Sequence, residues 1–239
     1  MVHFVLVHGL CHGTWCWYKV RPVLESAGHR VTALDLAASG INMNIHDLRS
    51  MSDYTRPLLE LMASIPPGEK VTLVGHSLGG LNIALAMDNF PRKISAAVFL
   101  TAFMPDTTYS PSYVIDKSLE GTSGDMLDTQ FSTHQDPGKS IPITKTLFGP
   151  KKLASKIGSL FQEDLSKRKA FSKEGYDYGN RIFILCKKDL AITEDFQHWM
   201  IENNPVKEVM EIEDADHMAM MSTPNQLCYC LLDIANKYT

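Results

Sequence analysis

The chain has 239 residues, a formal net charge of −4, 44% hydrophobic residues and 21% charged residues. This length accommodates one sizeable domain, and the composition is ordinary for a folded globular protein and excludes a disordered one. Without a basic surplus or a long run of one charge, nucleic-acid binding has no electrostatic support. The first apolar run, at residues 4–8, is too short for a signal-peptide core or a membrane span, and we expect no membrane partner.

The cysteines are odd in number and lack the paired spacing of metal ligands. They are Cys11, Cys16, Cys186, Cys228 and Cys230. We therefore expect reduced thiols in a cytoplasmic protein, each acting as a small buried apolar group.

Short apolar runs alternate with longer segments that have apolar residues at helical spacing. The strand-like runs are residues 4–8, 31–36, 71–76, 94–100, 181–186 and 209–212. The helix-like segments are residues 15–27, 48–65, 78–89, 194–203 and 225–237. Runs without strict alternation are typical of strands covered on both faces, so the pattern predicts a mostly parallel sheet with helices on both sides, an α/β fold.

One interval breaks this alternation. Residues 105–179 contain no strong strand signal, and a structureless loop of that length is improbable in a compact domain. We therefore expect a core made of residues 1–104 and 180–239, with residues 105–179 inserted as a cap of short helices over the functional edge of the sheet.

The strongest motif is Gly75-x-Ser77-x-Gly79, placed between a strand-like and a helix-like run. That context is the one required by a nucleophile elbow, in which a strained strand-to-helix turn presents a serine at the edge of the sheet. The motif predicts Ser77 as a catalytic nucleophile.

A serine of this kind needs a histidine base and an acid that follow it in the chain. Of the later histidines, His134 lies in the expected cap and His198 inside a helix, whereas His217 follows the last strand-like run. We therefore expect His217 to be the base.

Asp189 follows the preceding strand-like run and is the expected acid, which would fix the tautomer of the histidine and stabilise its imidazolium form. Asp214 and Asp216 are rivals because they are close to His217 in sequence, although a near neighbour usually points away.

The glycine-rich turn after the first strand-like run predicts half of an oxyanion hole. The N–H of Leu10 there and that of Leu78, after the nucleophile, would bind the oxyanion. His8 and His12 are four residues apart, but the glycines around them argue against the rigid helix that a metal pair needs. We expect neither metal nor cofactor.

Segments along nearly the whole chain resemble the plant methylesterase family of α/β-hydrolases, and most closely its members like polyneuridine aldehyde esterase. The matching segments are residues 4–9, 13–17, 24–29, 32–42, 75–80, 127–131, 148–150, 163–165 and 215–220. The resemblance implies an α/β-hydrolase fold, a small hormone or indole-alkaloid ester as substrate, and is compatible with a homodimer.

The resemblance also discriminates between reactions. Hydroxynitrile lyases of the same group carry threonine where this chain has Gly9, and lysine where it has Met218; methionine cannot supply that positive charge. The family also has a longer cap, and the resemblance implies that residues 160–166 here fuse two of its elements. We expect this shortened cap to give a more open site.

We therefore predict a serine carboxylesterase that hydrolyses the methyl ester of a small plant metabolite through an acyl-enzyme. Spontaneous decarboxylation would follow if the product were a β-keto acid. The alternatives are a hydroxynitrile lyase and a hormone receptor with little turnover. The expected substrate-binding residues are Gly9 and the pocket-lining Leu10, Phe103, Met104, Met126, Phe131, Leu147, Phe148 and Met218.

Overall fold

The computed structural model describes residues 1–40, 48–120, 130–134, 143–148 and 156–238, with only the backbone for strands β5 to β7. The strands are β1 (His3–Val7), β2 (Arg30–Leu34), β3 (Val71–Ser77), β4 (Ile94–Ala102), β5 (Gln130–His134), β6 (Ile143–Phe148), β7 (Lys156–Ser159), β8 (Asn180–Cys186) and β9 (Glu208–Ile212). The α-helices are α1 (Val20–Ser26), α2 (Met51–Ser64), α3 (Gly79–Asn89), α4 (Tyr113–Glu120), α5 (Gln162–Leu165), α6 (Glu194–Asn203), α7 (Ala219–Ser222) and α8 (Pro224–Lys237).

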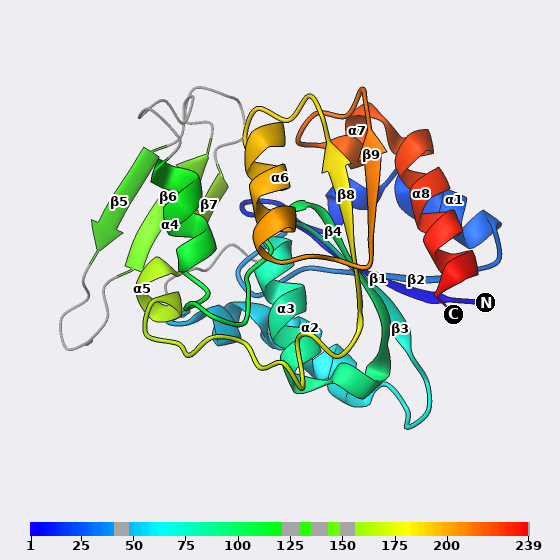
Figure 1. Cartoon of the computed structure of the whole chain (residues 1–239), viewed down its shortest axis with the longest axis horizontal. Helices are drawn as coiled ribbons and strands as arrows, with labels where there is room; N and C mark the ends of the chain where they lie inside the picture. The colour runs from blue at the N-terminus through cyan, green and yellow to red at the C-terminus, as the bar shows by residue number, and fades with distance from the viewer. Residues whose placement is uncertain (41–47, 121–129, 135–142, 149–155, 239) are drawn as a thin grey trace.

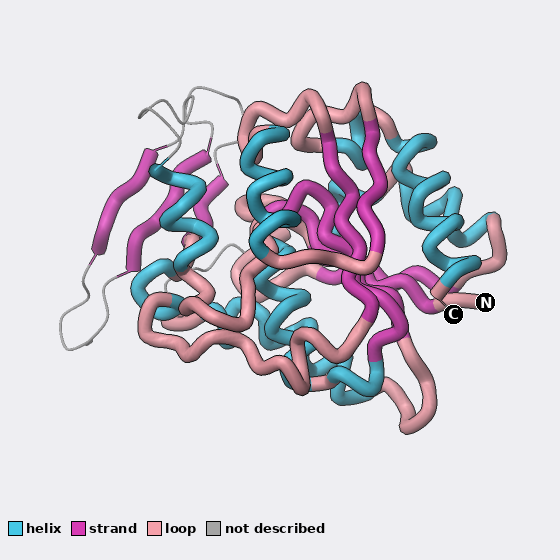
Figure 2. The backbone as a smooth tube through the Cα atoms, viewed as in Figure 1, coloured by secondary structure: helices cyan, strands magenta, loops and turns pink. Residues whose placement is uncertain are grey.

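Six strands form one sheet in the order β2-β1-β3-β4-β8-β9, and every neighbouring pair is parallel. Helices α1 and α8 lie side by side against one face, and α2, α3 and α6 cover the other (Figures 1 and 2). The predicted parallel sheet with helices on both faces is therefore confirmed.

Alternate residues of each strand point to opposite faces of the sheet and so enter two different cores. In β1, Val5 and Val7 join the core under α2 and α3, whereas Phe4 and Leu6 join the core under α1 and α8. All four side chains are fully buried, which explains why the sequence of this strand is a continuous apolar run.

Helix α3 is buried along nearly its whole length, from Gly79 to Met87. Apart from Asn82 this stretch is apolar on all sides, which suits its position, because β3, β4 and α2 all contact it. The nucleophile segment before it is thus held by the centre of the sheet and by a central helix.

Two expectations need correction. The single helix expected over residues 15–27 is divided into a 3-10 helix, η1 (Thr14–Trp17), and α1, because the chain turns between them. The inserted interval contains the helices α4 and α5, but β5, β6 and β7 between them form a separate antiparallel sheet. β-Branched residues such as Ile143, Thr144 and Thr146 suit a strand, but the segment has no continuous apolar run and so gave no strand prediction.

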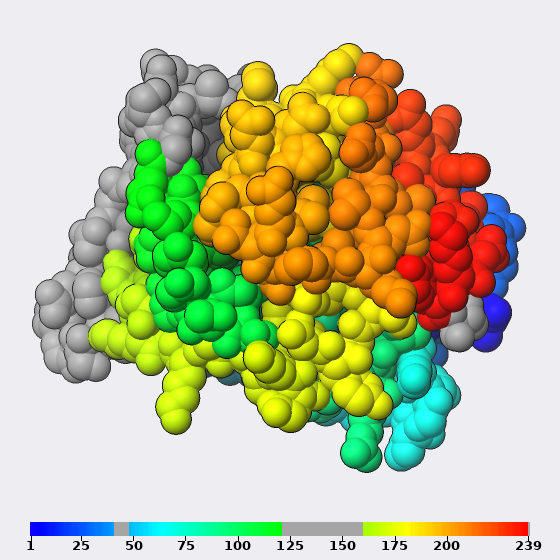
Figure 3. Space-filling model, in the orientation of Figure 1, coloured from blue at the N-terminus to red at the C-terminus, as the bar shows by residue number. Residues whose placement is uncertain are grey.

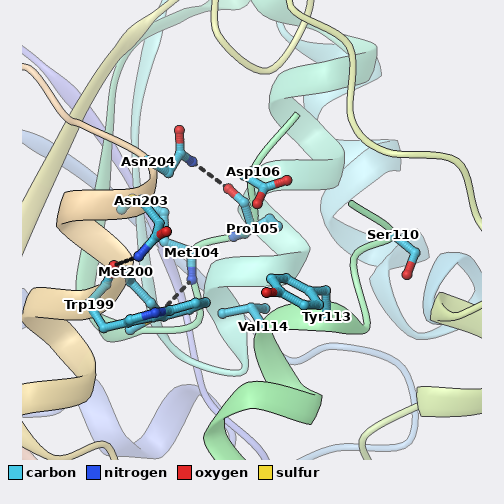
Figure 4. Close-up of a pocket in the computed structure, with 10 residues that line it drawn as sticks. All are labelled: Met104, Pro105, Asp106, Ser110, Tyr113, Val114, Trp199, Met200, Asn203 and Asn204. Atoms are coloured by element: carbon cyan, nitrogen blue, oxygen red, sulfur yellow. Dashed lines mark hydrogen bonds between the residues drawn. The ribbon is translucent and has the colours of Figure 1, made fainter. Parts of the chain in front are cut away.

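The inserted segment packs against the core at α6. Tyr113 of α4 lies beside Trp199 of α6, with ring centroids 6.2 Å apart, and the space-filling view shows α4 directly next to α6 (Figure 3). Between the two helices lies a cavity of about 10 Å³, where the side chain of Asn204 donates to the carbonyl of Pro105 (Figure 4). A space of that size holds at most one water molecule, so it is no substrate site.

Candidate active site

The three residues predicted to be catalytic lie at or just after the carboxyl ends of strands of the six-stranded sheet. Ser77 is the last residue of β3, Asp189 follows β8, and His217 follows β9. Because all these strands are parallel, their carboxyl ends share one edge of the sheet, which is where α/β folds place ligands.

Ser77 occupies a strained turn. Its φ angle is 55°, a conformation that a residue with a Cβ adopts only when its surroundings impose it. A Cβ on Gly75 would lie 2.6 Å from the carbonyl oxygen of Gly79, so the turn closes only around a glycine at this position. The local geometry is that of a nucleophile elbow.

The three side chains form one hydrogen-bonded line. The Oγ of Ser77 lies 3.1 Å from Nε2 of His217, and Nδ1 of His217 lies 2.7 Å from Oδ2 of Asp189. The imidazole is 21% exposed, whereas the carboxylate is fully buried. This arrangement allows a proton to pass from the hydroxyl to the ring while the carboxylate stabilises the resulting charge.

Asp189 is held as an acceptor on both oxygens. Its Oδ1 accepts from the N–H groups of Ala191 and Ile192, at 2.7 and 2.9 Å, and its Oδ2 accepts from Thr101 as well as from His217. The other two candidate acids have different partners. Asp214 forms a salt bridge with Lys188 at the surface, and Asp216 accepts a hydrogen bond from the N–H of Met218. Among these described carboxylates, Asp189 is the one that contacts the ring of His217.

The rival histidines are also elsewhere. His198 is half exposed on α6, with Nε2 3.9 Å from Glu194. His134 lies on β5, whose side chains are outside the described part of the structure. Among the described side chains, His217 is the histidine that contacts Ser77.

His76 joins the nucleophile strand to the base loop. Its Nε2 donates to the backbone carbonyl of His217 at 2.7 Å, and burial lowers its pKa well below the usual value, so the ring stays neutral. Sequence reasoning missed this residue, although its place immediately before the nucleophile was a signal.

The turn after β1 is fixed by a second buried histidine. Nε2 of His8 accepts from the N–H of Leu36 at 3.1 Å, so in the neutral ring Nδ1 carries the proton and donates to the carbonyl of Gly9 at 2.8 Å. Burial lowers the pKa of His8 to about 4, which keeps the ring neutral. Both ring nitrogens are thereby used in hydrogen bonds within the protein.

This hydrogen bond orients the expected oxyanion donor. A trans peptide unit points its C=O and its N–H in opposite directions, so fixing the Gly9 carbonyl also fixes the N–H of Leu10. Gly9 lies against the nucleophile, since a Cβ there would be 2.8 Å from the Cβ of Ser77. Leu78 precedes α3 directly, where backbone N–H groups have no intrahelical partner.

The expected pocket residues are placed only in part. Phe103 and Met104 are buried in the core under α3, Leu10 is partly buried against that core, and Met218 is half-buried beside the other core. Met104 also lines the small cavity of Figure 4, where its N–H faces the sulfur of Met200. Met126 lies outside the described residues, and the side chains of Phe131, Leu147 and Phe148 are not described.

The described part of the chain shows no group of three or more side chains that could hold a metal ion. Nor does it contain a helix long and apolar enough to cross a bilayer. All five cysteines are buried, as predicted, and burial raises the pKa of Cys228 to about 11 and of Cys16 to about 12, so both remain thiols near neutral pH.

The six-stranded fold and the hydrogen-bonded side chains of Ser77, His217 and Asp189 define the class of α/β-hydrolases. Comparison with known proteins gives the same class. The model of the Alpha/beta hydrolase family matches residues 4–228. The chain belongs to that family and, within it, to the plant methylesterase family, and it is a hydrolase of the methylesterase type.

The similarity to individual relatives extends over the whole chain. The chain is 52% identical to Methylesterase 3 of Arabidopsis thaliana, over 99% of this chain and 97% of the relative. It is 51% identical to Salicylic acid-binding protein 2 of Nicotiana tabacum, over 99% of this chain and 98% of the relative. The crystal structure of polyneuridine aldehyde esterase superimposes with a TM-score of 0.93 at 45% identity, over 98% of this chain and 99% of that one.

The first of these alignments spans 257 positions, against 239 residues in the chain. The relative therefore has residues that this chain lacks.

Proposed function

We propose that this enzyme hydrolyses the methyl ester of a small plant metabolite of the hormone or indole-alkaloid class, with Ser77, His217 and Asp189 as its catalytic residues. The observation that carries the proposal is the continuous contact from the Ser77 hydroxyl through His217 to the buried Asp189 carboxylate.

The reaction has two acyl-transfer steps. Oγ of Ser77 attacks the ester carbonyl while Nε2 of His217 takes its proton; the tetrahedral intermediate then expels methanol, which receives that proton. Water attacks the acyl-enzyme by the same route, returning the acid and free Ser77. The N–H groups of Leu10 and Leu78 stabilise the negative charge that develops on the carbonyl oxygen in both steps.

The site favours ester hydrolysis over cyanohydrin cleavage. A lyase of this group would carry a threonine at position 9, and here any Cβ at Gly9 would lie 2.8 Å from the Cβ of Ser77. A lysine would be needed at position 218, where this chain has Met218, so no cation is available there to receive cyanide.

The remaining features of the proposal concern the cap, the products and the location. The shortened cap is proposed to leave a more open site that admits bulkier esters. A β-keto acid product would lose carbon dioxide after release, without another residue. Five buried thiols accord with a reducing compartment, and we propose a cytoplasmic enzyme that needs no cofactor.

The decisive experiment offers the purified protein a panel of methyl esters, including methyl salicylate, other hormone esters and indole-alkaloid esters, and follows acid, methanol and carbon dioxide by mass spectrometry. We expect turnover of at least one ester, and none by Ser77→Ala. Cyanide release from mandelonitrile without ester turnover would instead assign a lyase. A downstream response that survives in Ser77→Ala would assign a receptor.

A further inference from the structure

Thr101 sits in an irregularity of β4, immediately beside the nucleophile. In the register of β3 with β4, His76 pairs with Leu100 and Ser77 pairs with Ala102, so Thr101 is the extra residue of a β-bulge. Its φ angle is 36°, a genuine outlier for a β-branched residue. Bulges are rare in parallel pairs, and near active sites they re-aim a side chain.

The bulge aims the Thr101 hydroxyl at the triad acid. Oγ1 of Thr101 donates to Oδ2 of Asp189 at 2.5 Å, the same oxygen that faces Nδ1 of His217 at 2.7 Å. Thr101 is completely buried and Asp189 is 3% exposed, so water does not compete for this oxygen. The two amides at Oδ1 hold one side of the carboxylate, and Thr101 holds the other.

We propose that Thr101 is a positioning residue of the catalytic site. Its hydroxyl sets the plane of the Asp189 carboxylate, and therefore the orientation of His217 toward Ser77. It also shares the negative charge of Oδ2 with the imidazole. The proposal rests on the hydrolytic function proposed above, because Thr101 acts through Asp189 and His217.

Two consequences follow from removing the hydroxyl. The carboxylate gains freedom to rotate about the side fixed by Oδ1, so His217 is less often aligned and kcat falls. The charge on Oδ2 is then no longer shared with a second donor and stabilises the imidazolium more strongly. The acid limb of the kcat/KM profile, where the ring must lose its proton, moves to higher pH.

The test compares Thr101→Val with Thr101→Ser. Valine keeps the shape of threonine and the same backbone strain but lacks the hydroxyl, whereas serine keeps the hydroxyl and lacks the methyl group. Hydrolysis of p-nitrophenyl acetate and the rate of covalent labelling of Ser77 by a fluorophosphonate are measured from pH 5 to 9, a range that spans the ordinary titration of histidine. Thermal unfolding checks that each variant is folded.

For Thr101→Val we expect kcat and the labelling rate to fall about ten-fold or more, whereas KM should change less than about two-fold. The acid limb of the kcat/KM profile should move to higher pH. Thr101→Ser should stay within about three-fold of the parent. Parental rates in Thr101→Val, an unmoved acid limb, or equal loss in both variants would each reduce Thr101 to a packing residue and overturn the proposal. If Thr101→Val does not fold, Thr101→Ala takes its place with the same outcomes.

The two proposals fail separately. A parent protein that neither hydrolyses esters nor reacts with the fluorophosphonate would end the hydrolase proposal. A reactive parent whose rates and acid limb are shared by Thr101→Val would end the inference about Thr101 alone.

Discussion

Nε2 of His76 donates to the backbone carbonyl of His217 at 2.7 Å, although 141 residues separate them in the chain. Their rings are also in contact, with centroids 4.8 Å apart. The residue that precedes the nucleophile thus holds the loop that carries the base, so the Ser77–His217 distance depends on a buried hydrogen bond as well as on the two strands.

His76→Met should therefore lower kcat about ten-fold, because the base loop loses its tether while the buried volume is kept. His76→Gln, whose amide N–H reaches about as far as Nε2, should retain more activity. Steady-state kinetics with an activated ester, accompanied by thermal unfolding, separate the two variants. Equal activity in both would show that the hydrogen bond does not position the loop.

Asp189→Asn should lower kcat about 10³- to 10⁴-fold with little loss of fold, since an amide favours the wrong tautomer of His217. Asp214→Asn is the matched control, because that carboxylate lies close to His217 in sequence but pairs with Lys188 at the surface. It should remain close to the parent. Initial rates of both variants on one ester decide whether Asp189 or Asp214 is the acid. A greater loss of rate in Asp214→Asn would contradict the assignment of Asp189.

Gly9→Ala should lower kcat strongly, because the new methyl group would meet the Cβ of Ser77 and push the turn that carries Leu10 away from the nucleophile. We expect a loss of about 10² or more, the size seen when one oxyanion donor is removed. Gly179→Ala is the control, since a Cβ there meets nothing within 4 Å. Activity and unfolding temperature are measured for both, and a fully active Gly9→Ala would contradict the close approach.

His8 predicts a pH dependence of stability. Its pKa is about 4 in the folded protein, against 6.5 as the ordinary value, so between these values the unfolded chain binds a proton that the folded chain excludes. The free energy of unfolding should therefore be highest above pH 6.5 and fall as the pH decreases toward 4, by about 3 kcal/mol from this group.

Urea titrations between pH 4 and 7 measure this slope, and His8→Asn should reduce it, because asparagine keeps a donor for the Gly9 carbonyl and does not titrate. A slope that is the same in His8→Asn and the parent would contradict the prediction.

The elements that depend on local pattern could be predicted from the sequence. The apolar runs that became β1, β3, β4 and β8 are buried on both faces, and the elbow around Ser77 needs only a strand, two small neighbours and a helix. The order nucleophile, acid, base then restricted the search to the loops after β8 and β9, where Asp189 and His217 lie.

The sheet of β5, β6 and β7 was not predicted, because short, largely polar strands without an apolar run give a weak signal. His76 lies within the nucleophile motif and His8 within the glycine-rich turn. Their hydrogen-bond partners, the carbonyl of His217 and the N–H of Leu36, belong to distant segments. Hydrogen bonds between distant segments leave no periodicity in the sequence.

By itself, the sequence determined the class of fold and the three residues proposed for the chemistry, because strand and helix patterns are local and chain order limits the choice. Only the tertiary structure decided which groups orient those residues. The bulge at Thr101 and its hydroxyl on Asp189 arise from contacts between distant segments that meet at one edge of the sheet. The peptide between Gly9 and Leu10 is fixed by His8, whose ring is held by the N–H of Leu36. Such contacts depend on register and on backbone strain, which are properties of the packed sheet.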